Sequence, residues 1–308
     1  THIPAFNMCP NSKVIALYGR DKQKTSDLAK KNNIEKVFND YKVMLERDDI
    51  DIISIALPPF LQYEYADLAI DAGKHILCEK PFTNNFSQAL KLTKKIKKSN
   101  LKGAVGYQMR FQPSRKAIKN IIIGGDLGEI INVNLSYSYS SRLETGLCWD
   151  WWSDKKLGGG VLNAMGSHQI DLLQWLFGDI ISAKGKLYNV NKSLNEKSSG
   201  LEKKVSSDEL AFGNVCFENN VNASIIISSV AIGWKTSLIE IYGTKGSLFL
   251  EGEENLKMIR KTTASHDLTQ KEDLLTNSWI SGSIWRAAFY RQINSFVNSI
   301  YYGKPYMG

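Results

Sequence analysis

The sequence predicts an α/β domain followed by a second domain built on an open, mainly antiparallel sheet. Over the first hundred residues, short apolar segments alternate with helical segments, which is the pattern of a parallel sheet covered by helices. After Gly128, polar and apolar residues alternate, which is typical of half-buried antiparallel strands. A chain of 308 residues is long enough for two such domains.

Four apolar segments in the first part are predicted to be buried parallel strands. They cover residues 13–21, 51–57, 75–80 and 101–107. The helical segments between them include residues 24–33 and 64–74, and the second of these ends at Gly73. In such sheets, ligands bind beyond the carboxyl ends of the strands. The tripeptide Glu79-Lys80-Pro81 is therefore predicted to lie on the ligand side.

The second part is predicted to hold five strands joined by tight turns such as Asn219-Asn220. These strands cover residues 129–140, 209–220, 221–230, 236–243 and 246–252. A helix is expected at about 161–177, a mobile insertion rich in Lys, Ser and Asn at 191–206, and a last helix at about 284–301.

Composition excludes several classes of protein. No apolar segment reaches the ~20 residues of a membrane span, so no membrane partner is expected. The four cysteines are scattered singly, which predicts reduced thiols in a cytoplasmic protein without structural zinc. The net charge of +8 favours an anionic cofactor or substrate. The densest basic segment, residues 91–100, is predicted to be the solvated side of a helix, and no nucleic acid partner is expected.

Three motifs carry a resemblance to a known family. They read "DIISIALPPFLQ…ADLAIDAGKHILCEKPF", "GYQMRFQPSRKAI…GGDLGEI" and "GGGVLNAMGSHQIDLLQWLFGD". Their order and spacing resemble the Gfo/Idh/MocA oxidoreductases over almost the whole chain. The resemblance implies a Rossmann-like NAD(P)-binding domain at 1–106 and a substrate and oligomerisation domain at 107–308, with helices on one face of its sheet. It also implies hydride transfer between nicotinamide and a sugar, a polyol or a related small molecule, in a homodimer or homotetramer.

Lys80 is the first predicted catalytic residue. A lysine beside nicotinamide can hydrogen-bond the reacting oxygen and stabilise its developing charge, and partial burial can tune its pKa. Glu79 would orient it, and Pro81 would fix the turn, with a cis Lys80-Pro81 bond possible. Without the other motifs, a solvent-facing turn at the end of a strand would be the better interpretation.

His168 is the second predicted catalytic residue, because an imidazole can exchange a proton near neutral pH. Asp171 lies three residues further on and shares its helix face. The family motif carries an Asp four residues before the histidine, where this chain has Ala164 beside Asn163. Either Asn163, Asp171 or a residue of the "CWDWWSD" loop replaces this Asp as the partner of His168, or proton transfer through His168 is weakened. His168 and Asp171 supply only two ligands, so no metal site is predicted.

Further side chains are predicted to bind substrate. Trp151, in the "CWDWWSD" loop, offers a flat apolar surface for a sugar ring, although three tryptophans so close together are also typical of interdomain packing. The resemblance implies that Tyr107 and Arg110 line the same cleft as Asn163 and Asp171. A structural ion pair is the alternative for Arg110.

The cofactor site is predicted at the carboxyl ends of the strands. Gly19 stands where the family's ribose-binding acid usually falls, and the next residue, Arg20, could bind a 2′-phosphate. NADP is therefore expected rather than NAD, with an ordinary Arg20-Asp21 turn as the alternative. Leu57 and Pro58 would supply uncharged contacts, alongside those of Glu79, Lys80 and Pro81.

The glycine-rich phosphate loop of a Rossmann domain does not occur in the sequence. The sequence is therefore expected to be a segment of a longer chain. Two functions remain open: an NAD(P)-dependent dehydrogenase or reductase, and a catalytically impaired relative that binds ligands or regulates.

Overall fold

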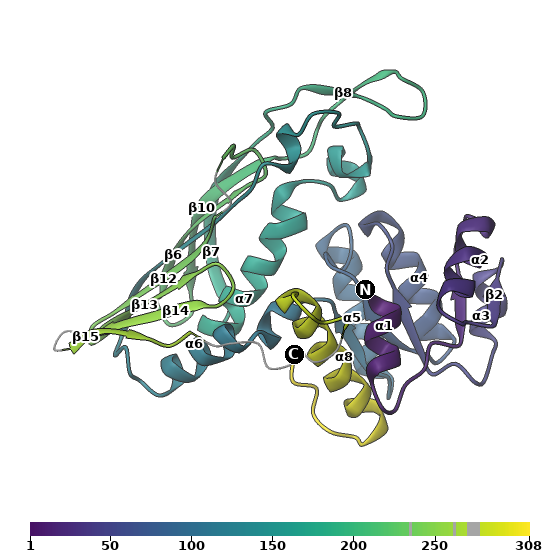
Figure 1. Ribbon diagram of the computed structural model, residues 1–308, viewed down its shortest axis with the longest axis horizontal. Helices are drawn as coiled ribbons and strands as arrows, with labels where there is room; N and C mark the ends of the chain where they lie inside the picture. The colour runs from purple at the N-terminus through teal and green to yellow at the C-terminus, as the bar shows by residue number, and fades with distance from the viewer. Residues whose placement is uncertain (234–235, 261–262, 270–277) are drawn as a thin grey trace. The chain divides into compact units, whose positions relative to one another are not determined.

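The computed structural model describes residues 1–233, 236–260, 263–269 and 278–308 (Figure 1). It divides into two units. The first contains Thr1–Gln108 and the C-terminal helix α8 (Ile284–Tyr301), and the second begins at Met109 and contains the large sheet. The sequence prediction instead began the second domain at residue 107 and included the C-terminal helix in it.

The first unit contains the predicted parallel strands, divided between two small sheets. One sheet pairs β1 with β2, and the other has the order β3-β4-β5. The four predicted strands are β1, β3, β4 and β5, whereas β2 was not predicted. The bounds are β1 Ala16–Tyr18, β2 Lys36–Phe38, β3 Ile52–Ile55, β4 His75–Cys78 and β5 Gly103–Val105.

Helices connect these strands, and side chains at their first turns satisfy free backbone N–H groups. Asp21, Asp40 and Asn85 accept hydrogen bonds from Lys24, Lys42 and Gln88 in this way. The second of two consecutive prolines, Pro59, opens α4, where its missing N–H costs nothing. The bounds are α1 His2–Met8, α2 Lys22–Lys31, α3 Tyr41–Leu45, α4 Pro59–Asp71 and α5 Phe86–Lys98.

Two apolar cores explain why α8 belongs to the first unit. In one core, Ile53, Ile55 and Ile76 pack against α4 and α5. In the other core, Phe289 and Phe296 of α8 pack against α1, Leu77 and Ala104. Successive residues of a strand point to opposite faces, so Ile76 and Leu77 face different cores. Because α8 covers one of these two faces, it is part of the Rossmann-like unit.

The second unit is built on an eight-stranded sheet with the order β15-β14-β13-β12-β6-β11-β10-β7. All its pairs are antiparallel except β6 with β11, so the sheet is mainly antiparallel, as the sequence predicted. Strands β7, β14 and β15 were not predicted. The bounds are β6 Ile130–Ser138, β7 Ile180–Tyr188, β10 Leu210–Phe217, β11 Asn222–Ser228, β12 Thr236–Gly243, β13 Gly246–Glu251, β14 Asn255–Arg260 and β15 Thr263–Asp267.

One face of this sheet is covered and the other is open. Helices α6 (Pro113–Ile123) and α7 (Ser167–Phe177) lie along the covered face (Figure 1), where Phe177 packs against Phe217 of β10. On the open face, Phe212 and its cross-strand neighbour Ile226 are 42% and 48% exposed. The ring of Tyr188 stacks on Phe212 with centroids 5.6 Å apart.

The segment predicted as a mobile insertion forms a hairpin of β8 (Ser193–Asn195) and β9 (Glu202–Lys204). Shorter helical turns complete the second unit. They are η1 Gln108–Phe111, η2 Ser141–Leu143, η3 Trp151–Ser153, η4 Lys155–Leu157 and the π-helix η5 Leu162–Gly166. Among the described residues, no helix is both long and apolar enough to cross a membrane.

Candidate active site

The turn after β4 is held in a defined shape. The Lys80-Pro81 peptide bond is cis, as the sequence allowed. The side chain of Gln62, fully buried in the first turn of α4, donates a hydrogen bond from Nε2 to the carbonyl oxygen of Pro81 at 3.1 Å. The backbone of Lys80 is thereby fixed from one side by its own turn and from the other by α4.

The charges of Glu79 and Lys80 depend on each other. Burial lowers the pKa of Lys80, and the neighbouring Glu79 carboxylate partly offsets that effect. Burial alone would raise the pKa of Glu79, but hydrogen bonding and charge from His2, together with Lys80, bring the pKa below its ordinary value. Glu79 is therefore ionised at neutral pH, beside an amine that loses its proton more readily than a free lysine does.

His2 is a site residue that the sequence did not reveal. Its Nε2 lies 2.9 Å from Oε1 of Glu79, and its Nδ1 lies 2.6 Å from Oγ of Ser54. These contacts join residues 77 and 52 positions apart, and no local pattern in the sequence indicates them.

Two charged residues follow the carboxyl end of β1: Arg20, which is exposed, and Asp21, whose carboxylate is hydrogen-bonded to the first turn of α2. Asp21 accepts a hydrogen bond from the backbone N–H of Lys24 at 3.0 Å and pairs with its side chain, and these contacts lower the pKa of Asp21. Asp21 therefore stabilises the start of α2. Arg20 is exposed. A Cβ atom at Gly19 would lie 2.3 Å from the hydroxyl oxygen of Thr25, so a larger residue there would displace that side chain.

The two uncharged residues predicted at the cofactor site follow β3. Leu57 is partly buried and packs against the core that contains Ile53 and Ile55. Pro58 immediately precedes α4 in an extended conformation, with φ −56° and ψ 148°. Both residues follow the carboxyl end of β3. The Glu79-Lys80 turn follows the carboxyl end of β4, so it lies at the same edge of the parallel sheet.

In the second unit, the glycine run before α7 is required by close backbone contacts. Gly158 and Gly160 have φ values of +81° and +108°, and a Cβ atom at Gly160 would overlap the carboxylate of Asp208. That carboxylate accepts a hydrogen bond from the backbone N–H of Leu162 at 2.8 Å, and burial raises its pKa. These contacts fix the start of the π-helix that leads into α7.

His168 lies in the first turn of α7 and is 3% exposed. Asn163, a predicted substrate ligand, lies within the π-helix. Its Nδ2 is 3.4 Å from the carbonyl oxygens of both Gly158 and Gly159, so its amide group contacts the glycine run. The sequence predicted one continuous helix from 161 to 177, whereas the structure interrupts it with a π-helical turn, a feature often found near functional sites.

Asp171 and Arg110 form a two-pronged ion pair. The distances are 2.8 Å from Arg110 Nε to Asp171 Oδ2 and 2.5 Å from Nη2 to Oδ1. Burial raises the pKa of Asp171, and the Arg110 guanidinium opposes this effect. The ion pair that was the alternative interpretation of Arg110 is therefore present. Tyr107, the last predicted substrate ligand, belongs to the first unit, and its backbone N–H bonds to the carbonyl of Val105.

The tryptophan loop is supported by a buried acid. Glu209 is fully buried and accepts hydrogen bonds from the backbone N–H groups of Val190 and Asn191. It also pairs with Arg142, whose guanidinium lies over the Trp152 ring at 4.6 Å. Trp151 is partly exposed on the same short helix as Trp152.

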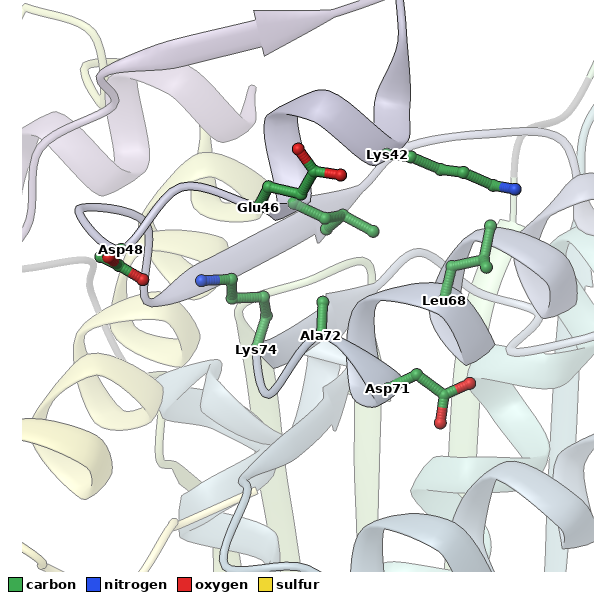
Figure 2. A pocket seen from close by; sticks show the side chains of 8 residues that line it. Lys42, Glu46, Asp48, Leu68, Asp71, Ala72 and Lys74 are labelled. Atoms are coloured by element: carbon green, nitrogen blue, oxygen red, sulfur yellow. The ribbon is translucent and has the colours of Figure 1, made fainter.

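The hollow in Figure 2 is lined by residues of α3, the end of α4 and the segments that follow them, and contains none of the predicted site residues. Its lining includes Glu46, Asp48 and Lys74, whose segments lead into the amino ends of β3 and β4. That edge is opposite the ligand side of a parallel sheet. Within the described residues, no three His, Cys, Asp or Glu side chains form a group that could hold a metal ion.

Two family models match the chain. The model described as an oxidoreductase family with an NAD-binding Rossmann fold matches residues 1–107. The model described as the GFO/IDH/MocA C-terminal domain matches residues 116–249. An uncharacterized oxidoreductase of Synechocystis sp. is 34% identical over 260 residues, which are 83% of this chain and 69% of that protein.

Solved structures share the whole fold. An oxidoreductase domain protein from Kribbella flavida aligns with a TM-score of 0.89 at 23% identity, over 99% of this chain and 88% of that chain. Levoglucosan dehydrogenase, in complex with NADH and L-sorbose, aligns with a TM-score of 0.87 at 20% identity, over 98% of this chain and 84% of that chain.

Proposed function

Since this chain belongs to the Gfo/Idh/MocA family of NAD-binding oxidoreductases, we propose that it transfers a hydride between NADP or NAD and a sugar, a polyol or a related small molecule. The observation that carries the proposal is the turn after β4, where a partly buried lysine stands beside an ionised glutamate. The bound nicotinamide supplies or accepts the hydride, which is chemistry that no side chain provides.

Lys80 polarises the reacting oxygen in this proposal. Its ammonium group donates a hydrogen bond to the alcohol or carbonyl oxygen and stabilises the negative charge that develops there. Because burial lowers its pKa, Lys80 can also release its proton more readily than a free lysine. The hydrogen bond from Gln62 to Pro81 and the one from the Lys80 backbone N–H to Glu79 hold the turn that carries this lysine.

His168 exchanges the proton of the substrate hydroxyl, and Asn163, Arg110 and Asp171 bind the polyhydroxyl group. The Arg110–Asp171 pair would present a guanidinium edge and carboxylate oxygens in a fixed orientation, which suits vicinal hydroxyls. Trp151 and Tyr107 provide apolar surface for the carbon face of the ring. The levoglucosan dehydrogenase that shares this fold was solved with NADH and L-sorbose, which supports a carbohydrate as the substrate class.

We propose NADP as the preferred cofactor. The residues at the end of β1 fit a 2′-phosphate, because Arg20 is exposed while the carboxylate of Asp21 is used in capping α2. An NAD site would need a free acid at this position for the ribose hydroxyls. Gly19, Leu57, Pro58 and the 79–81 turn complete the proposed cofactor contacts.

The chain is also proposed to form a homodimer or homotetramer through the open face of the large sheet. Phe212, Ile226 and the stacked Tyr188 form an apolar group on that face. Apolar side chains that neighbour each other on an exposed sheet favour association with a second surface.

The test is a spectrophotometric assay at the reduced-nicotinamide absorbance band, with NADP and NAD and a panel of sugars, anhydrosugars and polyols. Lys80→Ala should reduce kcat by about a hundredfold or more, since general acid–base and electrostatic contributions are of that size. Lys102→Ala is the matched control, because Lys102 is an exposed lysine that precedes β5. Turnover of Lys80→Ala at the wild-type rate would contradict the assignment.

A catalytically impaired binding protein is the second candidate. It is favoured by Ala164 in place of the motif's acid and by the pairing of Asp171 with Arg110. This candidate predicts that calorimetry detects NADPH binding while no member of the panel is turned over. Turnover that is lost in His168→Asn and retained in His75→Asn would exclude it.

A further inference from the structure

His2 joins a helix to two strands of the first unit through both nitrogens of its ring. His2 is the first residue of α1. Its Nδ1 lies 2.6 Å from Oγ of Ser54 on β3, and its Nε2 lies 2.9 Å from Oε1 of Glu79, which follows β4. Its face packs against the ring of Phe289 on α8, with centroids 4.8 Å apart. The His2 side chain is 17% exposed, and its contact with Glu79 is partly buried, whereas Ser54 is exposed to water.

The charge on Glu79 determines which nitrogen of His2 carries a proton. An ionised carboxylate can only accept hydrogen bonds, so Nε2 of His2 must donate to it. In the neutral ring, Nδ1 is then the acceptor, and the hydroxyl of Ser54 donates to it. The Ser54 hydroxyl can donate or accept, and it is therefore compatible with the tautomer that presents an N–H to Glu79. The titratable and charged groups that act together here are His2, Glu79 and Lys80.

The second oxygen of Glu79 faces the residue proposed to be catalytic. Oε2 accepts a hydrogen bond from the backbone N–H of Lys80 at 3.2 Å. On another side, the carboxylate lies against the backbone of Gly106, where a Cβ atom would be 3.4 Å from Oε2. The carboxylate is therefore held between His2, Gly106 and Lys80, and it has little freedom to turn.

We propose that His2 is a positioning residue for the reaction, which holds the Glu79 carboxylate in the one orientation that keeps Lys80 charged and correctly directed. This inference rests on the proposed function, because it assigns Lys80 to the chemistry. The competing interpretation is that His2 only anchors α1. The positioning role requires the hydrogen bond of His2 to Glu79, whereas the anchoring role does not depend on that bond alone. The two interpretations therefore make different predictions for variants that keep one hydrogen bond of His2 and lose the other.

Two substitutions in the full-length protein separate the hydrogen bonds. In His2→Gln, the side-chain amide reaches the position of Nε2 and keeps a donor to Glu79. In His2→Asn, the shorter amide matches Nδ1 and keeps only the contact with Ser54. We expect kcat to fall about tenfold or more in His2→Asn, with KM for the cofactor nearly unchanged, because a hydrogen bond to a charged group is lost. We expect His2→Gln to stay within about threefold of the wild-type kcat.

The matched control is His75→Asn. His75 lies at the amino end of β4, and its Nδ1 accepts a hydrogen bond from the backbone N–H of Lys102 at 2.9 Å, which an asparagine can reproduce. This variant undergoes the same chemical change at the edge of the sheet away from Glu79. It should keep the wild-type kcat.

A second readout does not depend on turnover. Reductive ¹³C-methylation makes lysine amines visible by NMR, and the Lys80 signal is assigned by its absence in Lys80→Ala. Its titration midpoint should move to lower pH in His2→Asn and remain in place in His2→Gln, since a displaced carboxylate supports the cation less. If the wild-type protein turns over no substrate, the proposed function fails, and the titration still decides the role of His2. Equal behaviour of the two variants in this titration, or a wild-type kcat in His2→Asn, would overturn the inference.

Discussion

The ion pair between Arg110 and Asp171 can be measured as a coupling energy. Its two hydrogen bonds are 2.8 and 2.5 Å long, and the two side chains are only 23% and 11% exposed. Hydrogen bonds to charged groups contribute about 1.5–3 kcal/mol, and partial exposure reduces the sum for two of them, so we expect a coupling of about 2–3 kcal/mol. The variants are Arg110→Ala, Asp171→Ala and the double variant, and the free energy of unfolding comes from urea titration.

The matched control is the pair of Arg260 with Asp126 in the same unit. Its hydrogen bond is also 2.5 Å long, but its side chains are 43% and 44% exposed. Solvent screening should limit its coupling to about 0–1 kcal/mol. The assay therefore compares a largely buried arginine–aspartate pair with two hydrogen bonds and an exposed pair with one. Equal coupling energies for the two pairs would refute the reasoning, because neither burial nor the second hydrogen bond would then strengthen the Arg110–Asp171 pair.

Three further predictions concern the proposed function. Activity should fall as pH rises through the pKa of Lys80, which burial lowers from 10.5, because the cation is then lost. In Lys80→Arg the residual activity should not fall over that pH range, because arginine keeps its charge. The measurement is the pH profile of kcat/KM, and the same fall in both proteins would contradict the prediction. Arg20→Ala should reduce the preference for NADPH over NADH by about tenfold, and an unchanged ratio of kcat/KM values would exclude Arg20 from phosphate binding. Phe212→Lys combined with Ile226→Lys should give a smaller particle by light scattering, whereas an unchanged mass would reject the open sheet as the interface.

The strands of the first unit were predictable because their apolar segments are nearly continuous. Residues 75–80 and 101–107 contain β4 and β5, and the turn after β4 lies at the carboxyl end as expected. Strand β2 was missed, since its three residues begin with a lysine and none of them is fully buried. Strand β7 was missed for a similar reason. It is the edge strand of its sheet, and eight of its nine residues are exposed, so it lacks the alternation that reveals a half-buried strand.

The candidate site was partly predictable. Lys80, Glu79 and His168 were proposed because they lie in motifs, and the ion pair of Arg110, foreseen as an alternative, is present in the structure. His2 and Gln62 could not be assigned to the site, because their partners are 77 and 19 positions away in the sequence and only the folded chain brings them together. The place of α8 in the first unit was missed for the same reason, since its contacts with α1 join the two ends of the chain.

The parallel pairing of β6 with β11 determines how this unit can be made on the ribosome. Strand β6 is central, and both of its neighbours, β11 and β12, are synthesised more than eighty residues later. Until residue 228 has left the exit tunnel, both edges of β6 offer unsatisfied N–H and C=O groups to any passing strand, and one edge stays open until residue 243 has emerged. Nascent chains that stall before that point should therefore depend on chaperones, and expression fragments that end there should be recovered in inclusion bodies.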